Sequence, residues 1–228
     1  MEIRAGYHKR LRDIQDDILV MGSMVEKALA NSVLALKERD LASAGRITAD
    51  DVRINRKRFE IEEKCIQLIA TQQPMAGDLR LIVSVLSIIT ELERIGDYAE
   101  GIARIVVMIG DEPPLKPLID IPRMADKAIL MLRQSLEAFI NRDADAAMRI
   151  AAEDDEVDSL YDQVFRELLT FMIEDPRTIT RATRLIWVAH NLERSADRVT
   201  NICERVAFAV TGKMVETKAL KRQSQGGA

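Results

Sequence analysis

The sequence predicts an all-α fold built from a duplicated three-helix unit. Hydrophobic residues make up 47% of the 228 residues and charged residues 31%, whereas aromatic residues make up only 4%. This balance is typical of long amphipathic helices and differs from that of β-sandwiches and barrels. Apolar residues recur at helical spacing along most of the chain, and parts of the second half repeat the first. These three observations favour helices packed on helices.

Three long helices are expected in the first half. The first covers about residues 4–39, and Asp40 is a candidate N-cap for the second. Pro74 should end the second helix, because the residue before a proline avoids helical dihedral angles. Asp78 is a candidate cap for the third helix, which should reach about Ile109.

A proline-rich connector separates the two halves. The segment GDEPPLKPLIDIP, residues 110–122, holds four of the six prolines. Three further helices are expected beyond it, over about 122–141, 143–173 and 178–211, with a break at residues 175–176. The predicted organisation is therefore a first three-helix repeat over 1–113, a second over 114–216 and a disordered tail over 217–228.

The two halves match one another in collinear order. At an offset of 103 the first half's Asp40, Arg46, Ile47 and Asp51 fall on Asp143, Arg149, Ile150 and Asp154. Pro74 falls on Pro176 at offset 102. At offset 100 the first half's Leu92, Glu93, Arg94, Asp97 and Ile102 fall on Leu192, Glu193, Arg194, Asp197 and Ile202. The offset shrinks only where loops can absorb the change, which favours an internal duplication whose copies pack on each other.

Composition argues against several classes of protein. A net charge of −4 gives no basic face for nucleic acid. The charged N-terminus lacks the apolar region of a signal peptide, and the longest clean apolar run, residues 81–90, is too short to span a bilayer. Cys65 and Cys203 stand alone, as expected of small buried residues in a reducing compartment. We therefore expect a cytoplasmic protein that reaches membranes only through its partners.

Oxygen-bearing side chains form a row beside the core stripe of the third and sixth predicted helices. The expected core residues are Leu81, Val85, Ile88, Leu92, Ala99, Ile102 and Val106 in the third helix, and Leu185, Val188, Leu192, Val199, Ile202 and Val206 in the sixth. The adjoining rows are Glu93, Asp97 and Glu100 in the first copy and Glu193, Asp197 and Asn201 in the second. Such rows lie about 100° round the helix from the core, at its border.

Like charges four residues apart repel, so something must offset the repulsion. One interpretation is a salt-bridged surface, in which Arg94 pairs with Asp97 and Arg194 pairs with Asp197. The other is a hard cation held by carboxylates of neighbouring helices. Two pairs at equivalent points of the repeat, Asp51 with Asn55 and Asp154 with Asp158, would supply the opposing oxygen atoms. His190 faces roughly the same way as Glu193, but we expect it to be a surface or packing residue.

At these residues the sequence resembles the PhoU family, the phosphate-uptake regulators of bacteria. The segments LERIGDYAEGI, NLERSADRVTNI and QQPMAGDLRLI look like that family's signature stretches, and the resemblance covers about residues 4–212. It implies two tandem three-helix bundles related by pseudo-two-fold symmetry. It also implies acidic motifs that bind multinuclear metal clusters.

The resemblance places the metal ligands on four motifs of this chain. They are Glu93 with Asp97, Glu193 with Asp197, Asp154 with Asp158, and Asp51 with Asn55, with Glu100 and Asn201 as additional donors. Asn55 replaces an expected acid, and Gly101 stands where the second copy has Asn201, so the first site should be the weaker. The expected ions are iron, manganese, magnesium or zinc.

The resemblance also implies a role and a set of partners. The expected protein is a homodimeric, non-enzymatic adaptor that couples the ATPase subunit of the high-affinity phosphate ABC transporter to a sensor histidine kinase, and so represses the phosphate-starvation response. Two alternatives are a ferritin-like di-metal enzyme and a metal-free helical scaffold. The enzyme alternative is weakened because neither His8 nor His190 completes a Glu-x-x-His motif.

Overall fold

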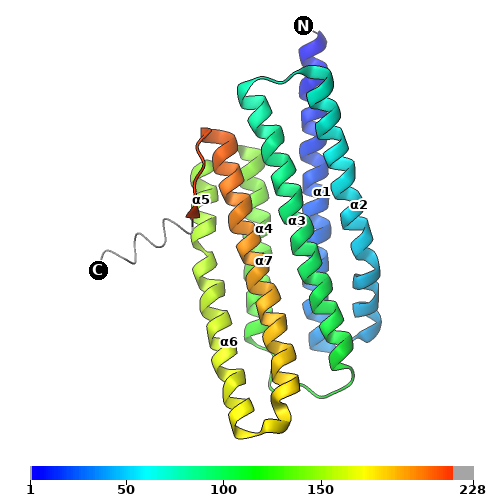
Figure 1. Ribbon diagram of the computed structural model, residues 1–228, viewed down its shortest axis with the longest axis vertical. Coiled ribbons are helices and arrows are strands. Elements are labelled where there is room, and N and C mark those ends of the chain that lie inside the picture. Colours follow the sequence, from blue (N-terminus) through cyan, green and yellow to red (C-terminus); the bar gives the residue numbers. More distant parts are fainter. Residues whose placement is uncertain (1, 218–228) are drawn as a thin grey trace, which may run out of the picture.

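The computed structural model describes residues 2–217, with side chains from residue 6 onward, and every regular element in that range is helical (Figure 1). The helices are α1 (Glu2–Glu38), α2 (Leu41–Gln72), α3 (Ala76–Ile109), α4 (Asp120–Asn141), α5 (Ala144–Ala152), α6 (Asp154–Glu174), the short 3₁₀ helix η1 (Pro176–Thr178) and α7 (Ile179–Thr211). The predicted all-α class is confirmed.

Two bundles lie side by side with their helices roughly parallel to one long axis (Figure 1). Helices α1 to α3 form one bundle, and α4 to α7 form the other. Antiparallel α3 and α7 meet in the centre, and α1 packs on α4 behind them. Every predicted core residue of α3 and α7 is buried, so the helical period placed both stripes correctly.

The contacts between α3 and α7 show the pseudo-two-fold symmetry directly. Glu91 of α3 accepts a hydrogen bond from Asn201 of α7, with 3.2 Å between Oε2 and Nδ2. A second contact lies ten residues further along α3 and ten residues earlier along α7. There, a Cβ built on Gly101 would lie 3.5 Å from the side-chain amide of Asn191. Positions 91 and 191 are equivalent in the repeat, as are 101 and 201, so the two contacts exchange under a two-fold rotation. The axis therefore passes between α3 and α7, midway between these two contacts.

Equivalent caps begin the second helix of each half. Asp40 accepts a hydrogen bond from the Ser43 backbone N–H at 2.9 Å, and Asp143 accepts one from that of Ala146 at 2.8 Å. The cap predicted at Asp40 is therefore confirmed, with the same geometry recurring at offset 103. The residues before these caps, Arg39 and Arg142, both have positive φ, at 59° and 54°. The two helix-to-helix turns are thus repeats of one another.

Three sequence-based boundaries differ from the structure. Asp78 is not a cap: α3 begins at Ala76 after Met75, and Asp78 lies in its first turn. Helix α4 begins at Asp120, two residues early, because proline is tolerated in a first turn, where backbone N–H groups have no intrahelical partner. The predicted continuous helix over 143–173 is broken at Glu153.

At this break, hydrogen bonds between residues three apart replace those between residues four apart. The Glu153 N–H donates to Ile150 O at 3.0 Å, and Glu153 O accepts from the Glu156 N–H at 3.1 Å. Lys127 of α4 reaches both side chains, with its Nζ 2.9 Å from Glu153 and 2.8 Å from Glu156. The tightened turn lets α6 restart at a buried Asp154.

Two expectations concern the chain ends. Helix α1 is long and apolar enough over Gly6–Glu38 to cross a membrane by length and composition, but core helices of soluble proteins pass the same test, and Ile18, Met21 and Val25 are fully buried in the bundle. Of the tail predicted over 217–228, only Thr217 is described, and it hydrogen-bonds to Glu204. The rest of that prediction lies outside the described residues.

Candidate acidic sites

The first-half site lies where α2 approaches α3 at Gly96. A Cβ built on Gly96 would be 3.1 Å from Ile54 Cδ1 and 3.7 Å from Asp51 Oδ1, so the bare backbone of Gly96 lets Asp51 lie against α3. The adjoining hollow has a volume of about 470 Å³, and both Asp51 and Glu100 line it. Helix α2 therefore places Asp51 next to the predicted row of acidic side chains on α3.

Polar partners satisfy part of this first site. Asp51 Oδ2 accepts a hydrogen bond from Asn55 Nδ2 at 2.8 Å, whereas Asp51 Oδ1 is buried without a hydrogen-bond partner among the described residues. Glu93 lies 3.3 Å from Arg58 Nη1, and Glu100 lies 2.6 Å from Arg104 Nε. Arginines that the pattern did not single out therefore offset some of the like charge.

The remaining repulsion appears in the pKa values. Burial, then the charges of Glu93 and Asp51, raises the pKa of Asp97 to about 6. Burial, then Glu100 and Glu93, raises the pKa of Asp51. Arg94 lowers the pKa of Asp97 but forms no ion pair with it within the described chain, so the pairing suggested by their spacing is absent here. The four first-half acids thus form one electrostatically coupled group.

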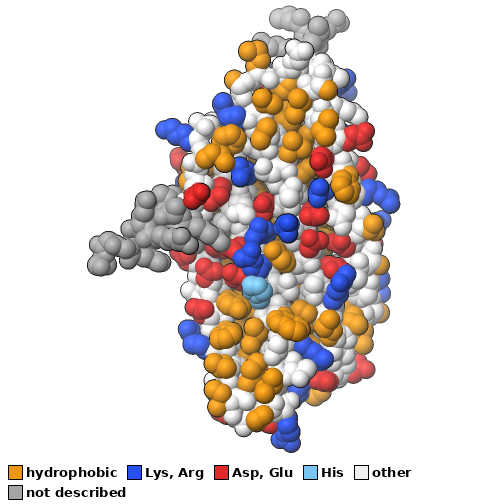
Figure 2. All heavy atoms as spheres, in the orientation of Figure 1, with side chains coloured by type: hydrophobic (Ala, Val, Ile, Leu, Met, Phe, Trp, Pro, Cys, Tyr) orange, Lys and Arg blue, Asp and Glu red, His pale blue; other side chains and the backbone are white. Residues whose placement is uncertain are grey.

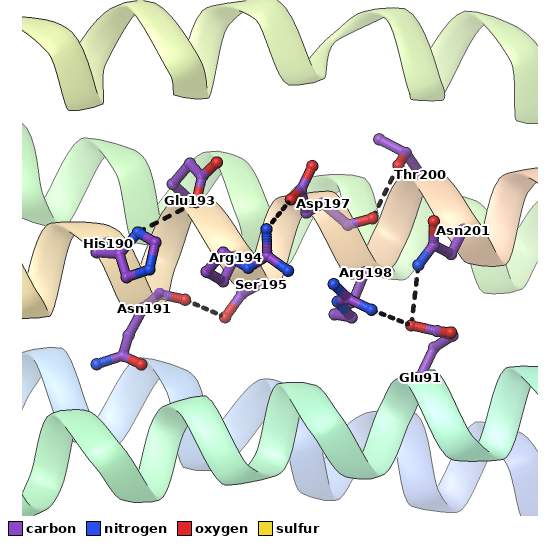
Figure 3. A network of polar contacts seen from close by, with 10 residues as sticks. All are labelled: Glu91, His190, Asn191, Glu193, Arg194, Ser195, Asp197, Arg198, Thr200 and Asn201. Carbon is purple, nitrogen blue, oxygen red and sulfur yellow. Dashed lines mark hydrogen bonds and ion pairs between the residues drawn. The ribbon is translucent and has the colours of Figure 1, made fainter. Parts of the chain in front are cut away.

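The second-half site lies between α7 and the α5–α6 break. Figure 3 shows Glu193 and Asp197 on the side of α7 that faces α6. Asp197 is 6% exposed and lies 2.8 Å from Arg194 Nη1, as one interpretation of the spacing predicted. Burial, then the charge of Asp197, raises the pKa of Glu193 to about 7, and Asp158 and Asp154 add to that rise. The second site therefore repeats the first with deeper burial.

His190 lies at the edge of this second cluster. Its side chain is 55% exposed, and its Nδ1 lies 3.5 Å from Glu193 Oε2, which makes an ion pair only when the imidazole is protonated. Among the described residues, Glu193 Oε2 has no regular hydrogen bond. The exposed ring agrees with the expected surface role.

Asn201 is a predicted donor that turns away from its cluster. Its amide faces α3 and donates to Glu91, which also lies 3.5 Å from Arg198 Nη1 (Figure 3). The contact between Glu91 and Arg198 could not be predicted from the sequence, because the two residues are 107 positions apart and meet only when the two bundles pack. Asn201 therefore joins the bundles in this structure.

The donors of both clusters suit a hard cation by chemical type. Carboxylate and amide oxygens are the ligands preferred by Mg²⁺ and Mn²⁺, and iron also accepts carboxylates. The buried, unpaired Asp51 Oδ1 points to one such ligand position. Within residues 2–217, however, no three His, Cys, Asp or Glu side chains are already gathered as a closed metal-binding group. Binding would thus require carboxylates to rotate from their arginine partners.

The metal-free protein is expected to lose stability as the pH rises from about 5 to 8. The pKa of Glu193 rises from 4.5 to about 7 on folding, so the native state binds that proton more tightly than the unfolded chain does. This contribution is complete below the unfolded pKa and is lost as the pH rises through the folded pKa. Glu193→Gln should therefore raise the free energy of unfolding at pH 8 by about 1 kcal/mol, after allowance for solvent screening.

Urea denaturation in a chelating buffer at pH 5 and at pH 8 measures this difference. Exposed Glu63, whose carboxylate accepts a bond from Gln67 outside the clusters, provides the control variant Glu63→Gln. If Glu193→Gln and Glu63→Gln changed the free energy of unfolding equally at pH 8, the electrostatic coupling of Glu193 to the other acids would be contradicted.

Comparison with known proteins identifies the family. The model of the PhoU domain matches twice, over residues 18–106 and 121–206, once in each half. The chain is 37% identical to a phosphate-specific transport system accessory protein PhoU homolog of Pseudomonas putida, over 97% of this chain and 87% of that protein. It is 36% identical to the accessory protein PhoU of Escherichia coli K12, over 92% of this chain and 88% of that one.

Solved structures agree with this assignment. The crystal structure of PhoU from Pseudomonas aeruginosa superposes with a TM-score of 0.86 at 36% identity, covering 91% of this chain and all of that one. PhoU from Streptococcus pneumoniae gives the same TM-score at 30% identity, with coverage of 92% and 99%. Sequence, repeat and architecture therefore agree, and the chain belongs to the PhoU domain family.

Proposed function

We propose that this protein is a cytoplasmic, homodimeric negative regulator of the phosphate-starvation response, which couples the ATPase subunit of a phosphate ABC transporter to a sensor histidine kinase. The observation that carries the proposal is the family match in both halves, together with relatives named as accessory proteins of phosphate-specific transport systems. Those names describe accessory proteins and no enzymatic activity, which agrees with the prediction of a non-enzyme.

The surface of the two bundles supports an adaptor role. Figure 2 shows apolar side chains gathered toward both ends of one broad face, with a charged band between them. By their place in the chain, Ile66 and Met75 lie near the turn between α2 and α3, 56% and 81% exposed, and Ile173 and Trp187 lie near the turn between α6 and α7, 74% and 49% exposed. Exposed apolar groups rimmed by charges are typical of protein-binding surfaces. A long helical face of this kind can contact two proteins at once.

Deletion of the gene tests the regulatory role. A reporter driven by a phosphate-starvation promoter should become active in phosphate-rich medium and should be silenced again when the intact chain is supplied. Capture of the tagged protein from detergent-solubilised membranes should bring down the transporter ATPase and the kinase. A reporter that stays fully repressed after deletion would refute the proposed regulation.

We also propose that the two acidic clusters hold metal ions. In the second half Glu193, Asp197, Asp154 and Asp158 would be the ligands, and in the first half Asp51, Asn55, Glu93, Asp97 and Glu100. The coupled, raised pKa values support this, because a cation would remove the repulsion that raises them. A bound ion would supply charge neutralisation and would cross-link α2 to α3 and α6 to α7.

Loss of metal is the expected result of Glu193→Ala combined with Asp197→Ala. The purified double variant should contain at least about tenfold less metal in its second site, since removing charged ligands weakens binding strongly. Elemental analysis of the intact protein measures this. The matched control is Glu60→Ala with Glu63→Ala, two exposed acids of α2 outside the clusters. Equal metal content in all three proteins would exclude the second site.

A further inference from the structure

A cavity with three charged residues in its lining lies at the end of the molecule where α3 begins and α4 and α7 end. These helix ends lie in the upper part of Figure 1. Its volume is about 320 Å³, and its lining includes Gly77, Asp78, Arg80, Phe139, Arg142 and Val206. None of these residues belongs to the acidic clusters. The cavity therefore brings two arginines and one carboxylate together outside the sites described above.

Arg80 is confined in this cavity by the backbone on two sides. A Cβ built on Gly77 would lie 3.7 Å from its Nη2, and one built on Gly212 would lie 3.4 Å from its Nε. Its guanidinium thus lies between the first turn of α3 and the end of α7, whose negative dipole favours a cation. The Nε atom is buried and has no hydrogen-bond partner among the described residues, which leaves a donor unsatisfied.

Arg142 reaches the same cavity from the end of α4. Its positive φ of 54° makes it the C-cap of that helix, so the backbone fixes where the side chain starts. Within the described side chains, neither Arg142 nor Arg80 forms an ion pair. The first turn of α3 adds backbone N–H groups that no side chain caps.

The other end of the molecule shows what this arrangement binds when an acceptor is present. Leu36, Arg39 and Ile109 line a cavity there, at positions equivalent to Phe139, Arg142 and Ala209. The connector fills it and leaves only about 30 Å³.

There the arginines bind oxygen atoms of the connector. Arg39 Nη1 lies 3.5 Å from Asp111 O, and Arg181, near the start of α7, lies 3.4 Å from Pro113 O and 3.8 Å from the Glu112 carboxylate. In this pseudo-two-fold copy, Arg39, the counterpart of Arg142, and the neighbouring Arg181 thus both contact oxygen atoms of the connector. At the α3 end, no described segment supplies such oxygen atoms.

Asp78 determines which oxyanion fits the open cavity. Burial, then the Asp78 charge, raises the pKa of Tyr7 to about 12, so the Tyr7 hydroxyl stays protonated beside that carboxylate. A carboxylate repels a fully deprotonated anion but accepts a hydrogen bond from one that carries a proton. Phosphate keeps a proton at neutral pH, whereas sulfate keeps none. Two arginines with one carboxylate therefore favour phosphate.

We propose that the cavity between α3, α4 and α7 binds inorganic phosphate, with Arg80 and Arg142 contacting its oxygens and Asp78 accepting a hydrogen bond from its hydroxyl group. The assignment goes beyond the regulatory role and stands without it. It gives the chain a binding site for the ion itself, separate from the acidic clusters and from the faces available to protein partners.

Titration calorimetry of the intact protein with inorganic phosphate, and separately with sulfate, tests this site. Phosphate should bind and sulfate should bind at least about tenfold more weakly, since an unpaired like charge in the site is costly. Arg80→Gln and Arg142→Gln should each weaken phosphate binding about tenfold or more, because each removes charge-assisted hydrogen bonds. Asp78→Asn should raise sulfate affinity and abolish most of the preference.

Two control variants test whether phosphate binds in this cavity and not elsewhere on the chain. Arg39→Gln removes the counterpart of Arg142, whose acceptor, the Asp111 backbone oxygen, lies within the chain, and it should leave phosphate affinity unchanged. The Glu193→Ala/Asp197→Ala variant should also bind phosphate normally, which excludes phosphate held through a metal in the second cluster. Circular dichroism checks that each variant is folded. Absence of phosphate binding to the wild-type protein, unchanged binding by both arginine variants, or equal affinity for phosphate and sulfate would overturn the proposal.

Discussion

Replacing Leu92 by alanine is expected to lower the free energy of unfolding by about 3 to 5 kcal/mol. Leu92 is fully buried in α3, the central helix of the first bundle, which packs on α1, α2 and α7. Such a site can collapse only partly around a lost isobutyl group, because helices on several sides hold it open. Urea denaturation followed by circular dichroism measures the change.

The internal repeat provides a second test of the same prediction. Leu192 occupies the equivalent place in α7 and is also fully buried, so Leu192→Ala should destabilise the protein to a similar extent. Val107 is 51% exposed on α3, and Val107→Ala should cost less than about 1 kcal/mol. A loss of under 1 kcal/mol for both leucine variants would show that the two stripes do not form the core.

The core could be predicted because one physical rule decides it locally. Apolar residues spaced three and four apart lie on one side of a helix, and that side must leave water. Val85, Ile88 and Ile102 are buried because they are apolar at this spacing, and other apolar residues of similar size would satisfy the same rule. The spacing also placed Glu93 and Glu193 at the border of the core, where the structure has them half-buried.

Partners from other helices could not be predicted in this way. Arg58 reaches Glu93 from α2, and Glu91 meets Asn201 only because the bundles pack antiparallel about the pseudo-two-fold axis. Helical period fixes the direction of a side chain but not the atom that it meets. The spacing of Arg94 and Asp97 suggested a pair that their rotamers do not make, whereas Arg194 and Asp197 do pair.

The break at Glu153 shows a further limit of local patterns. The stretch around it contains neither proline nor glycine, so nothing in its propensities indicates an interruption. The turn is tightened by hydrogen bonds between residues three apart and held by Lys127 of a different helix. The signal is therefore tertiary, and it acts where Asp154 enters the second acidic cluster.

Replacing Gly22 by leucine is expected to cost about 3 kcal/mol of stability, the second large effect. Gly22 is buried on α1 where it meets α4, and even a Cβ there would lie within 2.2 Å of Leu136 Cδ1. Glycine inside a helix ordinarily costs about 1 kcal/mol relative to alanine, so a larger residue would be favourable if space allowed it. Because the two bundles approach closely at Gly22, the substitution is expected to destabilise the protein, whereas replacing a helical glycine ordinarily stabilises it.

A double-mutant cycle separates the steric clash from any effect on the helix itself. In the Gly22→Leu background, Leu136→Ala should recover part of the lost stability, because the shortened side chain makes room across the contact between α1 and α4. In the wild-type background the same Leu136→Ala change should be destabilising, since Leu136 is only 3% exposed. The opposite signs require that the two residues touch. Additive losses in the cycle would instead mean that α1 and α4 do not approach each other this closely in solution, and the bundles would then be joined through α3 and α7 alone.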